Sequence, residues 1–182
     1  MAIFVVLLRA IGPITHKIMS MAQWREAVAD AGFEAPETYV ATGNMIVEGS
    51  GTLASVTRQM NEIVVGLGLG AGNRAIVRSP GQLAALVRAN PLPEAASTRP
   101  SQMGVYFFAS AAPDFSWIGD YQGPENIRIE GKHLIVDYNG GVANSKLPGL
   151  IEKRSGTATA RNWNTLCGLH ERATARRNKQ GH

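Results

Sequence analysis

Cysteine is nearly absent from this sequence, since Cys167 is the only one among 182 residues. A single cysteine cannot form a disulfide within the chain, and it excludes a zinc site built from several cysteines. The four histidines are scattered along the chain, and no His-Glu-x-x-His or P-loop motif is present. The sequence therefore predicts neither a metal site nor a cofactor.

Long hydrophobic runs are also lacking. No apolar run approaches the roughly 18 residues that a membrane span needs. The first apolar run, Ile3 to Leu8, has no basic segment before it, and a secretion signal would need one. We therefore expect a cytoplasmic protein without a membrane partner; no pattern in the sequence indicates an oligomeric state.

Charged residues make up only 18% of the chain, and their signs are unevenly spread. Residues 146–182 hold eight Lys or Arg against two Asp or Glu, a net charge of +6, whereas residues 1–145 hold ten against twelve, a net charge of −2. A basic C-terminal segment suits a polyanion or a phosphate ligand. It is equally typical of a solvated tail, and we expect the tail that carries Arg172, Arg176, Arg177 and Lys179 to end in disorder.

The first half of the chain alternates between strand and helix patterns. The apolar run at 3–8 is typical of a strand buried on both faces. Ser20 and Thr52 are expected N-caps of helices over 21–31 and 53–66. Further strands are expected at 38–41, 45–48 and 74–78, with a tight turn at Thr42-Gly43-Asn44. The resulting order, β-α-β-β-α-β, predicts a ferredoxin-like domain over residues 1–79.

The second half, residues 80–182, reads as a smaller α+β domain that ends in a basic helical tail. Ser79 and Pro80 begin a helix that runs to about residue 89, and three prolines make residues 90–101 a loop. Strands are expected at 102–109, 126–130 and 133–138, and helices at 148–155 and from about residue 160. The overall fold class is therefore α+β, with no repeat of fixed period.

The stretch from Gly156 to Leu169 predicts a loop that leads into a capped helix. Thr157 and Thr159 are both possible N-caps, and the apolar spacing from Trp163 onward is that of one helix face. Arg161 would then lie in the first helical turn, where the helix dipole disfavours a cation by roughly 0.3–1 kcal/mol. An anion should compensate for this charge.

Lys146 supplies a second cation near a glycine-rich bend. It follows Ser145, and the two come shortly after Gly140-Gly141. A lysine in such a place suits phosphate or carboxylate. If Lys146 and Arg161 converge, they form an anion pocket at a helix N-terminus. Alternatively, each pairs with an internal carboxylate such as Glu152 or Asp137.

Several short motifs occur together in a familiar order. The motifs are Thr159-Ala160-Arg161-Asn162-Trp163-Asn164-Thr165, Ser145-Lys146-Leu147, Leu8-Arg9, Thr38-Tyr39, Thr42-Gly43-Asn44, Val77-Arg78-Ser79 and Asn90-Pro91-Leu92-Pro93. With them the chain, to about Leu169, resembles the 1697 family of domains of unknown function. The resemblance implies two α+β parts, the first ferredoxin-like, and no known activity. The family usually has Arg-Gly-Ile-Asn after its first strand, whereas this chain has Arg-Ala-Ile-Gly at 9–12.

Our leading hypothesis is a cytoplasmic binding protein whose site lies in a cleft between the two halves. Its ligand would be anionic, a nucleotide or the phosphate of a nucleic acid. The expected ligand-binding residues are Arg9, Asn44, Ser145, Lys146, Arg161 and Asn162. One alternative is an enzyme acting on a phosphorylated or acylated small molecule, with Lys146 and Arg161 as electrostatic stabilisers. Another is a purely structural role, in which the polar motifs hold the halves together by hydrogen bonds.

Overall fold

The structure is a computed structural model that describes residues 1–181. Its contacts separate the chain into two compact units. The first unit comprises residues 1–84 together with the chain from residue 169 onward, and the second comprises residues 85–168. Each unit contains an antiparallel four-stranded sheet with helices, which confirms the α+β class. The division into domains 1–79 and 80–182 stays a prediction.

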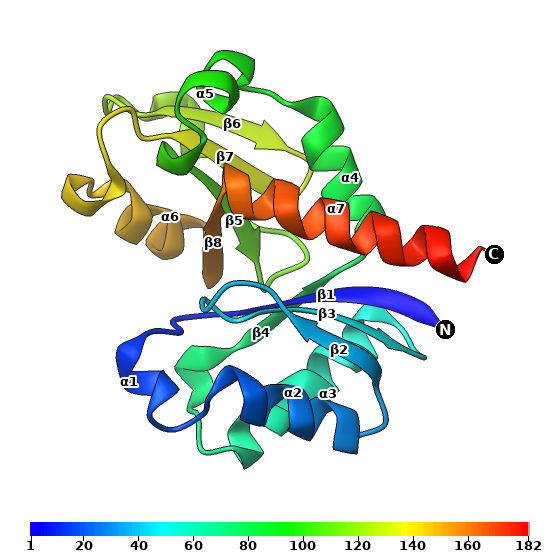
Figure 1. Cartoon of the computed structure of the whole chain (residues 1–182). Coiled ribbons are helices and arrows are strands. Elements are labelled where there is room, and N and C mark those ends of the chain that lie inside the picture. The colour runs from blue at the N-terminus through cyan, green and yellow to red at the C-terminus, as the bar shows by residue number, and fades with distance from the viewer. Residues whose placement is uncertain (182) are drawn as a thin grey trace. The chain divides into compact units, whose positions relative to one another are not determined.

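The sheet of the first unit has the strand order β2-β3-β1-β4, and all neighbours are antiparallel. Helices α2 and α3 cover one of its faces (Figure 1). The bounds are β1 Ala2–Leu8, α1 Pro13–His16, α2 Met21–Asp30, β2 Glu34–Thr38, β3 Asn44–Gly49, α3 Leu53–Gly66, η1 Ala71–Asn73 and β4 Ala75–Arg78.

Local capping explains where the two covering helices begin. The Ser20 hydroxyl accepts a hydrogen bond from the Gln23 N–H (3.1 Å), and the Thr52 hydroxyl accepts one from the Ser55 N–H (3.1 Å). Both predicted N-caps are therefore confirmed. The expectation for β1 is confirmed as well, because every side chain from residue 3 to residue 8 is buried.

The sheet of the second unit has the strand order β6-β7-β5-β8, again antiparallel throughout. Helix α6 packs on the face that carries Tyr106, Phe108 and Leu134. The bounds are α4 Pro80–Ala89, α5 Pro93–Thr98, η2 Pro100–Gln102, β5 Met103–Phe108, η3 Ile118–Asp120, β6 Asn126–Glu130, β7 His133–Asp137, η4 Val142–Asn144, α6 Leu147–Ser155, β8 Ala158–Asn162 and α7 Trp163–Gln180. Helix α4 leads into this unit from the first one, and α7 leads back.

The two sheets share one topology. In chain order, the second strand pairs with the third, the third with the first, and the first with the fourth, in both units. Helix α6 connects β7 to β8 as α3 connects β3 to β4, whereas short η3 and its loops replace α2 between the first two strands. The sequence shows no period, so this likeness lies in topology and not in repeated residues.

The start of the helix predicted from about residue 160 is wrong, because α7 begins at Trp163. Residues 158–162 form β8, and Arg161 pairs with Val105 across the sheet instead of lying in a first helical turn. The N-cap is Asn162, whose Oδ1 accepts a hydrogen bond from the Thr165 N–H at 2.8 Å. Pairing with β5 buries this segment, and such tertiary pairing overrides a local capping pattern.

Three further expectations about secondary structure are wrong. The loop over 90–101 contains α5 and η2, each with a proline in its first turn, where proline is favoured rather than disruptive. The second strand lies at 34–38 instead of 38–41; it is an edge strand with an irregular register that tolerates Pro36. Asn44 belongs to β3 and not to a turn.

The basic tail is ordered as helix through Gln180, which contradicts the expected disorder. Arg172 and Arg176 both form ion pairs with Glu37 of β2. Arg176 also donates to the carbonyl oxygen of Ala35 at 2.6 Å. Acidic and carbonyl groups of the first unit therefore bind part of the positive charge that the sequence assigned to a free tail.

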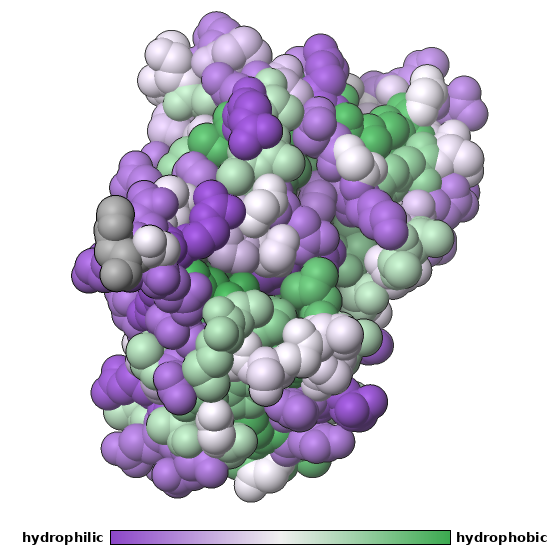
Figure 2. Space-filling model, turned by 90° about the vertical axis from the view of Figure 1, so that its right-hand side faces the viewer, coloured by the Kyte–Doolittle hydropathy of each residue, from purple (hydrophilic) through white to green (hydrophobic). Residues whose placement is uncertain are grey.

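Hydrophilic residues cover most of the face drawn in Figure 2, and apolar residues appear there in smaller groups. Large hydrophobic residues with high exposure come from several elements; they are Met1, Ile14, Ile18, Val40, Val65, Ile129 and Val142. None of the helices within residues 1–181 is long and apolar enough to cross a membrane.

Candidate functional site

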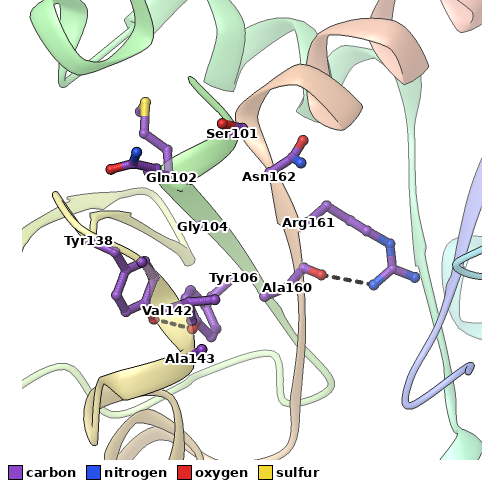
Figure 3. Close-up of a pocket in the computed structure, with 12 residues that line it drawn as sticks. Ser101, Gln102, Gly104, Tyr106, Tyr138, Val142, Ala143, Ala160, Arg161 and Asn162 are labelled. Carbon is purple, nitrogen blue, oxygen red and sulfur yellow. Dashed lines mark hydrogen bonds between the residues drawn. The ribbon is translucent and has the colours of Figure 1, made fainter. Parts of the chain in front are cut away.

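The second unit contains a pocket of about 460 Å³ (Figure 3). This volume falls in the range of small-molecule sites, roughly 300–1,000 Å³. The lining comes from η2 and the start of β5, from the segment that follows β7, and from β8. Its twelve residues are Ser101, Gln102, Met103, Gly104, Tyr106, Tyr138, Gly141, Val142, Ala143, Ala160, Arg161 and Asn162.

Two tyrosines form one end of the pocket. The hydroxyl groups of Tyr106 and Tyr138 are hydrogen-bonded to each other (Figure 3). Burial raises the pKa of both phenols, so both are neutral near pH 7. Gly104 provides the space for their rings, because a Cβ at this position would lie 3.1 Å from the Cε2 atom of each tyrosine. The rings of both tyrosines therefore come close to the sheet backbone at this glycine.

Two side-chain amides lie toward the other end of the pocket, and we call Ser101, Gln102 and Asn162 the amide end. The Gln102 Oε1 accepts a hydrogen bond from the Gly140 N–H at 2.9 Å, and the Asn162 Oδ1 accepts one from the Thr165 N–H. A backbone N–H can bond only to the oxygen of an amide, so the orientation of both amides is fixed. Their NH₂ groups make no hydrogen bond within residues 1–181.

Arg161 is the only charged residue in the lining. Its side chain leads away from the tyrosine pair (Figure 3), and its Nη1 donates to the Thr159 hydroxyl (2.7 Å) and to the Ala160 carbonyl oxygen (2.9 Å). The residue is 8% exposed, and burial lowers the pKa of the guanidinium to about 10. Arg161 therefore keeps its positive charge near pH 7.

Ser145 and Lys146 do not line the pocket, although both belong to the same unit. The Ser145 hydroxyl donates to Glu125 and accepts from the Leu147 N–H at the start of α6. The Glu125 pKa is lowered: burial acts to raise it, but hydrogen bonds from Ser145 and Tyr121 prevail. Lys146 occupies the N-cap position of α6, and its side chain is exposed. Ligand binding by these two residues stays a prediction.

Asp137 and Glu152 were the carboxylates that the sequence suggested as partners of the two cations. Both have contacts of their own. Asp137 forms an ion pair with Arg99, with 2.6 Å between Oδ2 and Nη2. The Glu152 Oε1 accepts a hydrogen bond from the Ala158 N–H at 3.4 Å. Asp137 is thus bound to a cation that the sequence did not single out.

Arg9 and Asn44 lie in the first unit. The buried Asn44 amide donates to the Tyr39 carbonyl oxygen and to the Thr42 hydroxyl, both at 2.9 Å. Arg9 Nη1 donates to the Gly72 carbonyl oxygen at 3.1 Å. These contacts order the loops at one end of the first sheet. Ligand binding by Arg9 and Asn44, and the cleft between the halves, stay predictions.

Gly43 explains why the Thr-Gly-Asn motif needs its glycine. Its φ angle is +86°, and a Cβ there would lie 2.8 Å from Ile11 Cγ1 and 2.9 Å from Leu8 Cβ. No other residue fits both the backbone angle and the space. The motif thus has a conformational reason in this chain.

Sequence reasoning found only Arg161 and Asn162 among the twelve lining residues. It missed Gln102, Tyr106 and Tyr138, which come from η2, from β5 and from the residue after β7, and which match no motif. One signal was present, since the glycines at 140 and 141 marked a bend whose flanking residues line the pocket. Within residues 1–181, no cluster of histidine, cysteine or acidic side chains is arranged to hold a metal ion.

Comparisons with known proteins place the chain in a family but give it no activity. A family model described as "Protein of unknown function (DUF1697)" matches residues 1–134; the motifs noted at 145–165 lie outside that match. Among solved structures, the conserved bacterial protein SP0830 from Streptococcus pneumoniae is similar, with a TM-score of 0.71 and 16% identity over 93% of this chain and 97% of that one. At this identity the likeness concerns the fold alone. No functionally curated protein matches the chain.

Proposed function

The chain belongs to the family described as protein of unknown function (DUF1697), and because that description names no activity we propose its function from geometry: it binds a small anionic organic molecule in the pocket of the second unit. The supporting observation is the chemistry of the lining. The lining has two amides with available NH₂ groups, and none of its twelve residues is acidic. Arg161 is the one cation among the twelve, although its side chain alternates with that of Ala160 and leads away from the tyrosine pair. Pockets of this size usually combine apolar walls with a few polar groups that fix the ligand's orientation.

Binding is favoured over catalysis by the same lining. Histidine, cysteine, lysine and carboxylate side chains supply most general bases and nucleophiles. None of the twelve lining residues is of these types. Serine and tyrosine can also act in these roles, but Ser101 has no basic partner of these types in the lining, and the Tyr106 and Tyr138 hydroxyls bond to each other. The hypothesis of an enzyme that acts on a phosphorylated or acylated molecule has less support than the hypothesis of a binding protein.

A nucleotide is the more specific form of the ligand, and the position of Lys146 supports it. This exposed lysine comes three residues after Ala143 of the lining, so their Cα atoms lie within about 11 Å of each other. A base held in the pocket would leave its phosphate able to reach Lys146. Longer nucleic acids are the second form; Arg9 and Asn44 of the first unit would then belong to a larger site.

The ferredoxin-like description of the first unit also belongs among our proposals. Its support is the chain order β1-α2-β2-β3-α3-β4 together with the strand order β2-β3-β1-β4. This is the order expected of a split βαβ unit. A cytoplasmic location is likewise proposed from the sequence.

A blocked pocket tests the proposed function. Ala160 is an exposed residue of the edge strand β8 and lines the pocket, so Ala160→Trp should fill the pocket without disturbing the core. Ala112→Trp, at an exposed loop position, is the matched control. We expect a saturation-transfer NMR screen of small acids, nucleosides and nucleotides to find ligands that bind the wild type and Ala112→Trp but not Ala160→Trp. Ligands that bind all three proteins equally, or no ligand at all, would contradict the proposal.

A further inference from the structure

We propose that the ligand is a carboxylic acid with a flat apolar body, whose carboxylate binds at the amide end. This inference rests on the proposed anion pocket, and it names a carboxylic acid instead of a nucleotide as the ligand class. Two observations carry it: the fixed orientation of Gln102 and Asn162, and the position of the tyrosine end two residues along β5 from the amide end.

The fixed amides make the amide end a site for hydrogen-bond acceptors. The oxygen of each amide is held by a backbone N–H, so each can offer only its NH₂ group to a ligand. The Ser101 hydroxyl lies beside them (Figure 3) and adjusts to either role. An ionised carboxylate accepts hydrogen bonds at both oxygens and donates none. An ammonium group only donates, so neither NH₂ group can bind it, and the Ser101 hydroxyl is the one side-chain acceptor that the amide end offers it.

The charge of the lining favours a carboxylate over a phosphate. A phosphate monoester carries close to two negative charges near pH 7, and an uncompensated charge is costly to bury. The single cation of the lining, Arg161, has a side chain that leads away from the tyrosine pair, and the amide end consists of neutral groups. The neutral NH₂ donors therefore suit a planar carboxylate, which carries one delocalised negative charge.

The distance along β5 between the two ends of the pocket sets the size of the ligand's apolar body. Gly104 pairs with Asn162, and Tyr106 pairs with Ala160, so the amide end and the tyrosine end are two residues apart along the strand. Two residues of a strand span about 6.6 Å, which suits one ring or two fused rings. Met103, Val142 and Ala143 supply the remaining apolar lining. A flat body can therefore lie between the amide end and the tyrosine rings.

The test compares ligands with the same body and opposite head groups. The three pairs are benzoate and benzylamine, 2-naphthoate and 2-naphthylmethylamine, and indole-3-acetate and tryptamine. We expect isothermal titration calorimetry on the full chain to show at least one acid binding tenfold or more tightly than its amine. Absence of binding by all three acids, or equal affinity within each pair, would overturn the inference.

Isosteric variants of the amide end provide the matched control. Gln102→Glu and Asn162→Asp keep the oxygen that accepts the backbone N–H, and they replace the available NH₂ by a negatively charged oxygen. Each should weaken binding of the acid at least tenfold and strengthen binding of the amine. Unchanged affinity for the acid in both variants would contradict the assigned position of the carboxylate.

The experiments distinguish a failure of the proposed ligand class from a failure of the proposed binding pocket. If Ala160→Trp abolishes binding but acids and amines bind the wild type equally, only the ligand class is wrong. If Ala160→Trp leaves every ligand bound, the pocket is not the site and the proposed function is wrong as well.

Discussion

The stability of α7 should depend on the side chain of Asn162. This residue caps an 18-residue helix, and its Oδ1 accepts the Thr165 N–H at 2.8 Å. Asn162→Ala removes this bond and leaves a first-turn N–H without its acceptor. Loss of an N-cap typically costs about 1 kcal/mol, within a range of about 0.5–2 kcal/mol.

Two substitutions at the same position separate the cap from other effects. Asn162→Ser and Asn162→Asp retain an oxygen that caps well, so their cost should be no more than a few tenths of a kcal/mol. The Asp variant also gains roughly 0.3–1 kcal/mol from the helix dipole. We therefore expect Asn162→Asp to be at least as stable as the wild type and Asn162→Ser, and Asn162→Ala to be clearly the least stable.

Thermal and urea unfolding monitored by circular dichroism measure this order. For a chain of this length, 1 kcal/mol corresponds to a shift in Tm of about 2–4 °C. The urea m-value should stay the same in all four proteins, because the surface exposed on unfolding does not change. Equal stability of the Ala and Asn proteins, or a Ser variant as unstable as the Ala variant, would refute the assignment of Asn162 as the cap.

Three further predictions concern packing, pH and the C-terminal helix. Gly104→Ala should destabilise the protein by about 1–3 kcal/mol, because the new methyl group would push on both tyrosine rings. Gly149→Ala in α6 meets no neighbouring atom and should stabilise the protein by about 0.5–1 kcal/mol. Urea unfolding measures both changes. Hydrogen bonds from Arg99 lower the pKa of Asp137. Its contribution to stability is therefore fully present above the ordinary carboxyl pKa of about 4 and is lost as the pH falls through the lowered pKa of the folded state. Asp137→Asn should be less stable than the wild type at pH 7, and the difference should shrink as the pH falls below about 4. Arg176→Ala, which loses its bonds to β2, should speed hydrogen exchange in residues 172–180, and unchanged exchange would exclude an anchoring role.

Much of the fold could be predicted from local chemistry. The N-caps Ser20 and Thr52 and the apolar run of β1 were recognisable, because each depends on residues within one short segment. Proline was misread around residues 90–101, since the same residue that breaks a helix interior also starts α5 and η2. The difference between the two roles depends on the neighbouring structure.

Arg161 shows why the local argument for an anion site was incomplete. Its sequence context resembles the first turn of a helix, but pairing with β5 makes residues 158–162 a strand. Nothing within that segment specifies a partner strand some 55 residues earlier in the chain, at Val105. The dipole argument therefore does not apply, although the residue does border a pocket.

The pocket itself depends on contacts that no single segment reveals. Gln102 becomes a fixed donor only because the Gly140 N–H reaches its oxygen, 38 positions away. The Tyr106 hydroxyl of β5 meets that of Tyr138, which directly follows the neighbouring strand β7. Such pairs follow from strand register, which the sequence pattern alone did not determine.

The side-chain amide signals of Gln102 and Asn162 test the central claim most directly. A ¹H–¹⁵N NMR spectrum of the ¹⁵N-labelled chain, with these two NH₂ groups assigned through Gln102→Glu and Asn162→Asp, can be followed while an acid that binds in the calorimetric test is added. Our account predicts that both NH₂ signals shift with the same saturation curve as the bound acid. Saturated binding with both signals unmoved would contradict it.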